Sequence, residues 1–124
     1  MCIILIIDDN ETLLESLRLS FEFHFADCQI LTARDGMDGL AQARQHQPNL
    51  ILCDTAMPTM DGYELLRQVR DDPTLRHIPF IFLTARSTQE DAKKGRALGA
   101  SDYLTKPFEF AELFAIVEKY LKQT

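Results

Sequence analysis

Short apolar runs alternate along the chain with longer segments whose apolar residues recur at helical spacing. Three of the runs are continuously apolar, which indicates strands that are buried on both faces of a sheet. They cover residues 2–7, 50–53 and 80–83. Weaker strand-like runs cover residues 29–33 and 102–104. The pattern therefore predicts five strands, three of them central and two at the edges.

One helical segment is predicted after each strand. The segments cover residues 11–25, a short stretch from Met37 that ends at Pro48, and residues 63–70, 88–98 and 109–121. Asn10 or Asp9 is suited to be the N-cap of the first of these helices. In the last segment Phe110, Phe114 and Leu121 share one apolar face, so we expect all three in the core.

Alternating strands and helices predict an α/β fold, a doubly wound five-stranded parallel sheet with helices on both faces. The second and fifth strands are the weak ones and fit the edges, which gives the strand order 2-1-3-4-5. This order places the topological switch point between the first and third strands, and open α/β sheets bind ligands at such a point.

Size and charge narrow the function classes. The 124 residues and 14.2 kDa fit a single domain over residues 1–124. A formal net charge of −6, with no long basic run, disfavours direct binding to nucleic acid or to anionic membranes. The apolar run over residues 2–7 is far shorter than the roughly 20 residues of a membrane span.

Cys2, Cys28 and Cys53 form no CxxC pair, so we expect three free thiols in a reducing cytoplasm.

Polar side chains follow four of the predicted strands directly or within two residues. They are Asp8 and Asp9, Asp54, Thr84 and Lys106. Because the carboxyl ends of parallel strands share one edge of the sheet, these groups are expected to meet there. Clustered carboxylates repel one another and call for a cation, and Mg²⁺ prefers such oxygen ligands. Helix capping alone would explain Asp9 or Asp54, but five polar groups at one edge favour a functional site.

Five segments resemble the motifs of the response-regulator receiver domains of bacterial two-component signalling. They cover residues 6–10 (IIDDN), 54–62 (DTAMPTMDG), 83–85 (LTA), 99–103 (GASDY) and 104–108 (LTKPF). Each motif is weak alone, but all five in order at the family's spacing are highly specific. The resemblance covers essentially the whole chain and implies the flavodoxin-like, CheY-like fold deduced above.

The resemblance implies a role for each residue at the edge. Asp54 would be the phosphoacceptor that forms an aspartyl phosphate, and Lys106 would pair with the phosphate. Thr84 and Tyr103 would move together as the switch. Mg²⁺ would be held by three carboxylates and one backbone carbonyl, from Asp8, Asp9, Asp54 and Ala56. The Lys106–Pro107 bond is expected to be cis.

The resemblance also implies partners. A sensor histidine kinase or a histidine phosphotransfer protein would supply the phosphoryl group, and a downstream effector protein or output domain would read the switch. The chain would catalyse its own phosphorylation and slow dephosphorylation, but would be mainly a signalling protein. Ala56 and Arg86 would flank the path of the hydrolytic water, and alanine has no polar atom to orient that water.

Two other functions share the predicted fold. A pseudo-receiver would bind partners without being phosphorylated, and such domains typically lack one of the acids, the threonine or the lysine. A flavodoxin-like cofactor-binding protein would need a loop rich in Ser, Thr and Gly after the first strand to hold a phosphate. Residues 8–11 are instead Asp-Asp-Asn-Glu, which repels anions unless a cation intervenes.

Overall fold

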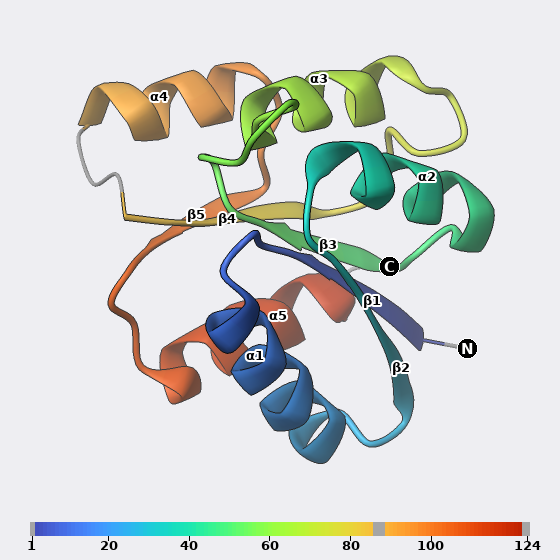
Figure 1. Cartoon of the computed structure of the whole chain (residues 1–124), viewed down its shortest axis with the longest axis vertical. Helices are drawn as coiled ribbons and strands as arrows, with labels where there is room; N and C mark the ends of the chain where they lie inside the picture. Colours follow the sequence, from blue (N-terminus) through green and yellow to red (C-terminus); the bar gives the residue numbers. More distant parts are fainter. Residues whose placement is uncertain (1, 86–88, 123–124) are drawn as a thin grey trace.

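The computed structural model describes residues 2–85 and 89–122. Within these residues, five strands form one parallel sheet in the order β2-β1-β3-β4-β5 (Figure 1). The strands are β1 (Cys2–Ile7), β2 (Cys28–Ala33), β3 (Leu50–Cys53), β4 (Phe80–Thr84) and β5 (Asp102–Thr105). The predicted fold class and strand order are confirmed.

Helices cover both faces of the sheet. They are α1 (Glu11–His24), α2 (Gly36–His46), α3 (Gly62–Asp71), α4 (Gln89–Ala97) and α5 (Phe110–Leu121). Helices α1 and α5 lie on one face, and α2, α3 and α4 lie on the other (Figure 1). The predicted bounds agree within one or two residues, although the predicted start of α4, residue 88, lies outside the described residues. None of the described helices is long and apolar enough to cross a membrane.

The core has two layers, one on each side of the sheet. Alternate residues of β1 point to opposite layers, Leu5 and Ile7 to one and Ile4 and Ile6 to the other. Every residue of β3 is buried, whereas β2 and β5 at the edges are mostly half-buried. Each fully buried aliphatic side chain contributes about 1.5–3 kcal/mol relative to an exposed one. The two layers therefore fix the sheet, and with it the ends of its central strands.

Helix α5 departs in part from its predicted core face. Leu113 and Val117 are fully buried, and Phe114 and Leu121 are half-buried against the same layer. Phe110 is 37% exposed, so its placement in the core was wrong. It starts the helix at the margin of the layer, where its ring packs on the Phe114 ring with centroids 5.8 Å apart.

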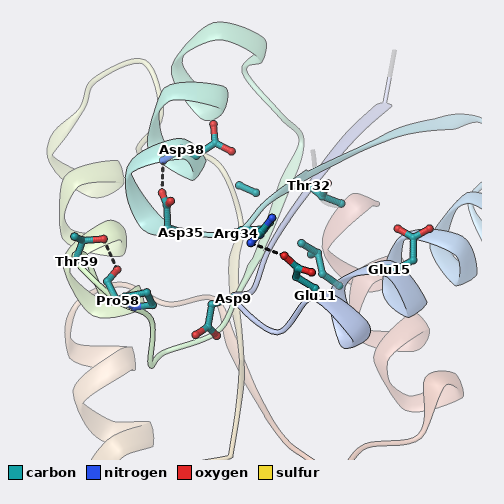
Figure 2. A pocket seen from close by; sticks show the side chains of 11 residues that line it. Asp9, Glu11, Glu15, Thr32, Arg34, Asp35, Asp38, Pro58 and Thr59 are labelled. Atoms are coloured by element: carbon teal, nitrogen blue, oxygen red, sulfur yellow. Dashed lines mark hydrogen bonds and ion pairs between the residues drawn. The ribbon is translucent and has the colours of Figure 1, made fainter.

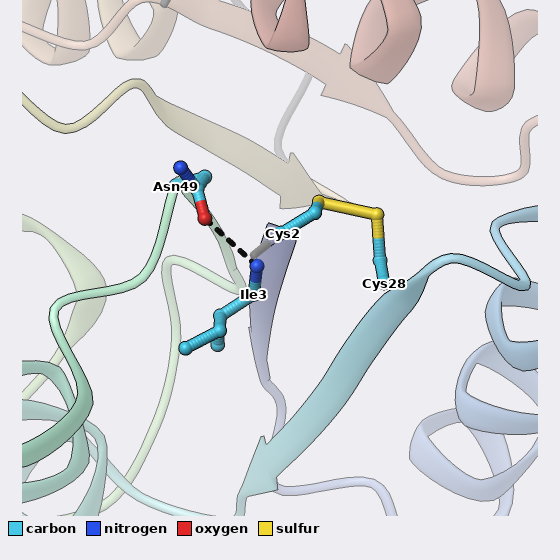
Figure 3. Close-up of a disulfide and its surroundings, with 4 residues drawn as sticks. All are labelled: Cys2, Ile3, Cys28 and Asn49. Atoms are coloured by element: carbon cyan, nitrogen blue, oxygen red, sulfur yellow. Dashed lines mark hydrogen bonds between the residues drawn. A yellow bond between two sulfur atoms is a disulfide. The ribbon is translucent and has the colours of Figure 1, made fainter.

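Two of the three cysteines form a disulfide, Cys2 with Cys28 (Figure 3). The expectation of three free thiols was therefore wrong for this pair. The parallel register makes Cys2 and Cys28 direct neighbours on β1 and β2, with Cα atoms 4.5 Å apart, and a separation of 26 residues in sequence gives no sign of this. Cys53 is a free thiol, as expected, and it is fully buried in the core. Burial raises the pKa of this thiol well above its usual value.

Reducing the Cys2–Cys28 bond should lower the free energy of unfolding by about 3 kcal/mol, because the cross-link restricts the unfolded chain. Urea unfolding with and without a reductant measures this. A Cys2→Ser/Cys28→Ser double variant is the control and should not respond to the reductant. Alkylation of the oxidised, denatured protein should label one thiol, and labelling of three would contradict the pairing.

Candidate functional site

The polar residues predicted at the carboxyl edge of the sheet do lie together. Asp8, Asp9 and Asp54 each bring one carboxylate oxygen to within 4.8 Å of the others. The Nζ atom of Lys106 lies 2.9 Å from Oδ2 of Asp8 and 3.7 Å from Oδ2 of Asp54. The site thus contains three carboxylates and one ammonium group that contacts two of them, which leaves an excess of negative charge.

Asp8 is the most enclosed of the three carboxylates, with a relative exposure of 1%. Its Oδ2 atom accepts a hydrogen bond from Lys106, and its Oδ1 atom accepts one from the backbone N–H of Asn10 at 2.9 Å. Both oxygens of this buried carboxylate therefore have a donor from the chain itself. Such pairing is what makes a buried charge tolerable.

Asp9 is exposed at the mouth of the site, and helix capping does not account for it. Asn10 is the N-cap of α1, since its side chain accepts a hydrogen bond from the N–H of Leu13 at 3.1 Å. Of the two predicted candidates for this cap, the structure selects Asn10. Asp9 is therefore available to interact with a ligand.

Asp54 follows β3, and its side chain is 12% exposed. It is not a helix cap either, because Asp61 caps α3. Burial raises the pKa of the Asp54 carboxyl above its ordinary value; the positive charge of Lys106 acts against this rise, and the negative charge of Asp8 adds to it. The Asp54 carboxyl group is thus partly desolvated at the opening of the site, which suits a group that reacts with an incoming molecule.

Gly62 fixes the loop that follows Asp54. Its N–H donates to the carbonyl oxygen of Thr55 at 2.9 Å. A Cβ atom at Gly62 would overlap the backbone carbonyl oxygen of Asp54, and backbone moves far less readily than the end of a side chain. A glycine is therefore required where α3 begins, directly against the backbone of Asp54.

Replacing Gly62 by alanine should lower the free energy of unfolding by about 1–3 kcal/mol, because the added methyl group must displace the Asp54 backbone. The matched control is Gly95→Ala in α4, whose Cβ would meet the buried Phe82 ring at 3.3 Å, so that the ring would need to shift by only a few tenths of an ångström. The free energy of unfolding of Gly95→Ala should stay within about 1 kcal/mol of the wild-type value, because the better helix propensity of alanine offsets the close contact. Urea unfolding compares the two variants. Equal costs would show that the loop moves freely.

Thr84, the predicted switch hydroxyl, is the last residue of β4 and is 1% exposed. Its Oγ1 atom lies 2.6 Å from Oγ1 of Thr55, within hydrogen-bonding distance. Thr55 is also 1% exposed and directly follows Asp54. Sequence reasoning did not single out Thr55, since a threonine in a loop after a strand is usual in turns. Its place beside the predicted switch residue appears only in three dimensions.

Tyr103 lies on β5, the edge strand next to β4. It is half-buried and packs on the core layer beneath α2, α3 and α4, with its ring centroid 6.2 Å from that of Phe82. Thr84 and Tyr103 thus sit on neighbouring strands, as a coupled pair would require.

The Lys106–Pro107 bond is cis, as expected. Arg86 lies outside the described residues, and Ala56 is exposed with its N–H 3.4 Å from Oδ1 of Asp54.

A strongly acidic pocket of about 880 Å³ opens beside Asp9 (Figure 2). Carboxylates dominate its charged lining, from Asp9, Glu11, Glu15, Asp35 and Asp38, against the single cation Arg34. Arg34 is itself paired with Glu11, and Asp35 accepts the N–H of Asp38 as the N-cap of α2. A lining of this charge repels the phosphate of an anionic cofactor, so the site speaks against a flavodoxin-like cofactor protein.

The sheet order and the arrangement of its helices define a CheY-like fold, with a cluster of carboxylates at the carboxyl edge of the sheet. The chain belongs to the response regulator receiver domain family, which matches residues 4–118. It is 44% identical over 117 residues to the response regulator PleD of Caulobacter vibrioides, covering 92% of this chain and 25% of PleD. It is 37% identical to the protein PilH of Pseudomonas aeruginosa over 121 residues, 98% of each chain. The chain thus spans a quarter of one relative and nearly all of another.

Solved structures of receiver domains and of chemotaxis proteins share this fold. The receiver domain of the Francisella response regulator 1452 superposes with a TM-score of 0.90 at 29% identity, covering 99% of this chain and 98% of that one. The chemotaxis protein CheY4 of Vibrio cholerae gives 0.86, also at 29% identity, over 97% and 98%. The chain is therefore a receiver domain of phosphorylation-based two-component signal transduction, a family that typically binds Mg²⁺ at an acidic pocket.

Proposed function

We propose that residues 1–124 form one receiver domain that works as a phosphorylation-dependent switch, with Asp54 as the phosphoacceptor. The observation that carries the proposal is the convergence of Asp8, Asp9 and Asp54 within 4.8 Å, with the ammonium of Lys106 between two of them. Of these carboxylates, Asp8 has both oxygens paired, whereas Asp54 is partly exposed and lies 3.7 Å from Lys106. Asp54 is therefore the carboxylate best placed to react.

The donor is a phosphohistidine of a sensor histidine kinase or of a phosphotransfer protein. A carboxylate oxygen of Asp54 attacks the phosphorus in line, the P–N bond breaks, and the leaving imidazole takes up a proton. The product is an acyl phosphate. Lys106 pairs with the phosphoryl oxygens, where negative charge collects, and positioning and charge stabilisation of this kind are most of what phosphoryl transfer requires.

The residues of the site fit Mg²⁺ for two reasons. They offer the hard carboxylate oxygens that Mg²⁺ prefers, and the negative charge of three carboxylates exceeds the single positive charge of Lys106 beside them. When bound, Mg²⁺ would neutralise charge on the transferred phosphoryl group. Asp9 and Asp54 would be its direct ligands, with the backbone carbonyl of Ala56. Asp8 would act partly through water, which suits the two hydrogen bonds that already occupy its oxygens.

The switch consists of Thr84 and Tyr103. Thr84 would move to bond a phosphoryl oxygen on Asp54, and Tyr103 on the neighbouring strand would turn inward behind it. A downstream effector protein or output domain would read the changed surface. The setting is cytoplasmic, as is typical of receiver domains that take phosphate from histidine kinases. This rests on family membership and not on the cysteines, two of which are joined in a disulfide.

Incubation with acetyl phosphate and Mg²⁺ should add one phosphate to the protein, and Asp54→Asn should abolish the adduct, because an amide cannot attack as a carboxylate does. Intact-protein mass spectrometry measures the adduct. The control is Asp38→Asn, which removes an exposed carboxylate from the acidic pocket beside Asp9, and this variant should be phosphorylated like the wild type. An adduct that persists in Asp54→Asn, or that forms equally in EDTA, would rule out the assignment.

Replacing Asp9 by alanine should weaken Mg²⁺ binding at least tenfold, because a direct carboxylate ligand is lost. The wild type should gain about 2.7 kcal/mol of unfolding free energy at a Mg²⁺ concentration a hundred times its dissociation constant. Thermal unfolding at a series of Mg²⁺ concentrations gives, for each protein, the Mg²⁺ concentration at which half of the stabilisation is reached, with Asp38→Asn again as the control. If this concentration is the same for Asp9→Ala and the wild type, Asp9 is not a ligand.

A further inference from the structure

We propose that Thr55 is a positioning residue that holds the Thr84 hydroxyl in the resting protein and thereby sets the threshold of the switch. The inference rests on the proposed roles of Asp54 and Thr84 and adds a residue that those roles do not include. In the resting protein Thr84 is bound to Thr55. When Asp54 is phosphorylated, Thr84 must give up this bond to reach the phosphoryl group.

The observation behind the proposal is a short contact between two buried hydroxyls. The Oγ1 atoms of Thr55 and Thr84 are 2.6 Å apart, a distance typical of a strong O–H···O bond. Both residues are 1% exposed. Among the described residues only Asp8, Thr55 and Thr84 are buried and polar or charged, and all three adjoin the candidate site. A hydroxyl pair at this depth is shielded from competing water.

Hydrogen bonds hold the backbone of both threonines in place. The carbonyl oxygen of Thr55 accepts the N–H of Gly62, the residue that must be glycine to pack on Asp54. The carbonyl oxygen of Thr84 accepts the N–H of Lys106 at 2.7 Å. Threonine is branched at Cβ and therefore has few side-chain rotamers. Movement of the Thr84 hydroxyl thus requires a change of rotamer, and such a change breaks the contact with Thr55.

Breaking this contact has a cost that phosphorylation must exceed. Whichever of the two hydroxyls donates, rotation of Thr84 towards Asp54 takes its Oγ1 atom away from Thr55 and leaves the buried Thr55 hydroxyl without this bond. A net hydrogen bond of ordinary strength corresponds to a factor of about five in the equilibrium. The charged phosphoryl oxygens offer a stronger, charge-assisted bond in exchange. The pair therefore favours the resting arrangement until the phosphoryl group is present.

Thr55→Val tests the proposal, because valine keeps the shape of threonine and lacks the hydroxyl. Beryllofluoride, which stands in for the phosphoryl group, is titrated in Mg²⁺ while NMR follows the Thr84 and Tyr103 signals. The half-saturating concentration should fall about fivefold in Thr55→Val. In Thr55→Ser, which restores the hydroxyl, it should stay within twofold of the wild type. An unchanged or higher concentration in Thr55→Val overturns the proposal.

A second measurement needs neither metal nor beryllofluoride. Scalar couplings to the Thr84 methyl carbon report its χ1 rotamer in the resting protein. One rotamer is expected in the wild type and in Thr55→Ser, and rotamer averaging in Thr55→Val. Averaging supports the role of Thr55 even if beryllofluoride leaves the wild type unchanged, in which case the proposed function fails alone. A single unchanged rotamer in Thr55→Val overturns the role of Thr55, whatever the titration shows.

Discussion

The ion pair between Lys106 and Asp8 is the interaction on which the site depends. It joins residues 98 positions apart in the chain, one after the first strand and one after the last, at 2.9 Å. Asp8 is buried, and a buried carboxylate beside two others would be strongly unfavourable without a positive charge. Lys106 supplies that charge and still reaches Asp54 at 3.7 Å. The same ammonium group thus stabilises the resting fold and marks the place where a phosphoryl group would bind.

The sheet makes this pairing possible. Ile7 and Cys53 are register partners on β1 and β3, so the residues that follow them, Asp8 and Asp54, emerge side by side at the carboxyl edge. The two apolar layers hold these central strands from both faces (Figure 1). The favourable burial of apolar side chains in the two layers therefore offsets the unfavourable repulsion between carboxylates at the edge of the sheet. Loops after the strands then add Asp9 and Thr55, whose surroundings differ sharply: Asp9 is exposed and Thr55 is buried.

Sequence reasoning failed where a residue's environment depends on contacts distant in the chain. Cys2 and Cys28 looked like free thiols because nothing local shows that two parallel strands begin in register. Phe110 looked like a core residue because helical spacing predicts which face of the helix points to the core. The spacing does not predict how deeply each residue on that face is buried, and Phe110 lies at the margin of its layer. Thr55 was missed because its neighbour Thr84 is 29 residues away, at the end of another strand.

The sequence by itself determined the elements, the strand order and the edge of the sheet that carries the polar residues. Continuous apolar runs can only be central strands of such a sheet, and the ends of parallel strands must share an edge. The tertiary structure alone decided which atoms meet there. It paired Lys106 with Asp8 more closely than with Asp54, made Asn10 the cap of α1, and set Thr84 against Thr55. These choices depend on strand register and on burial, and both arise only when the whole sheet has packed.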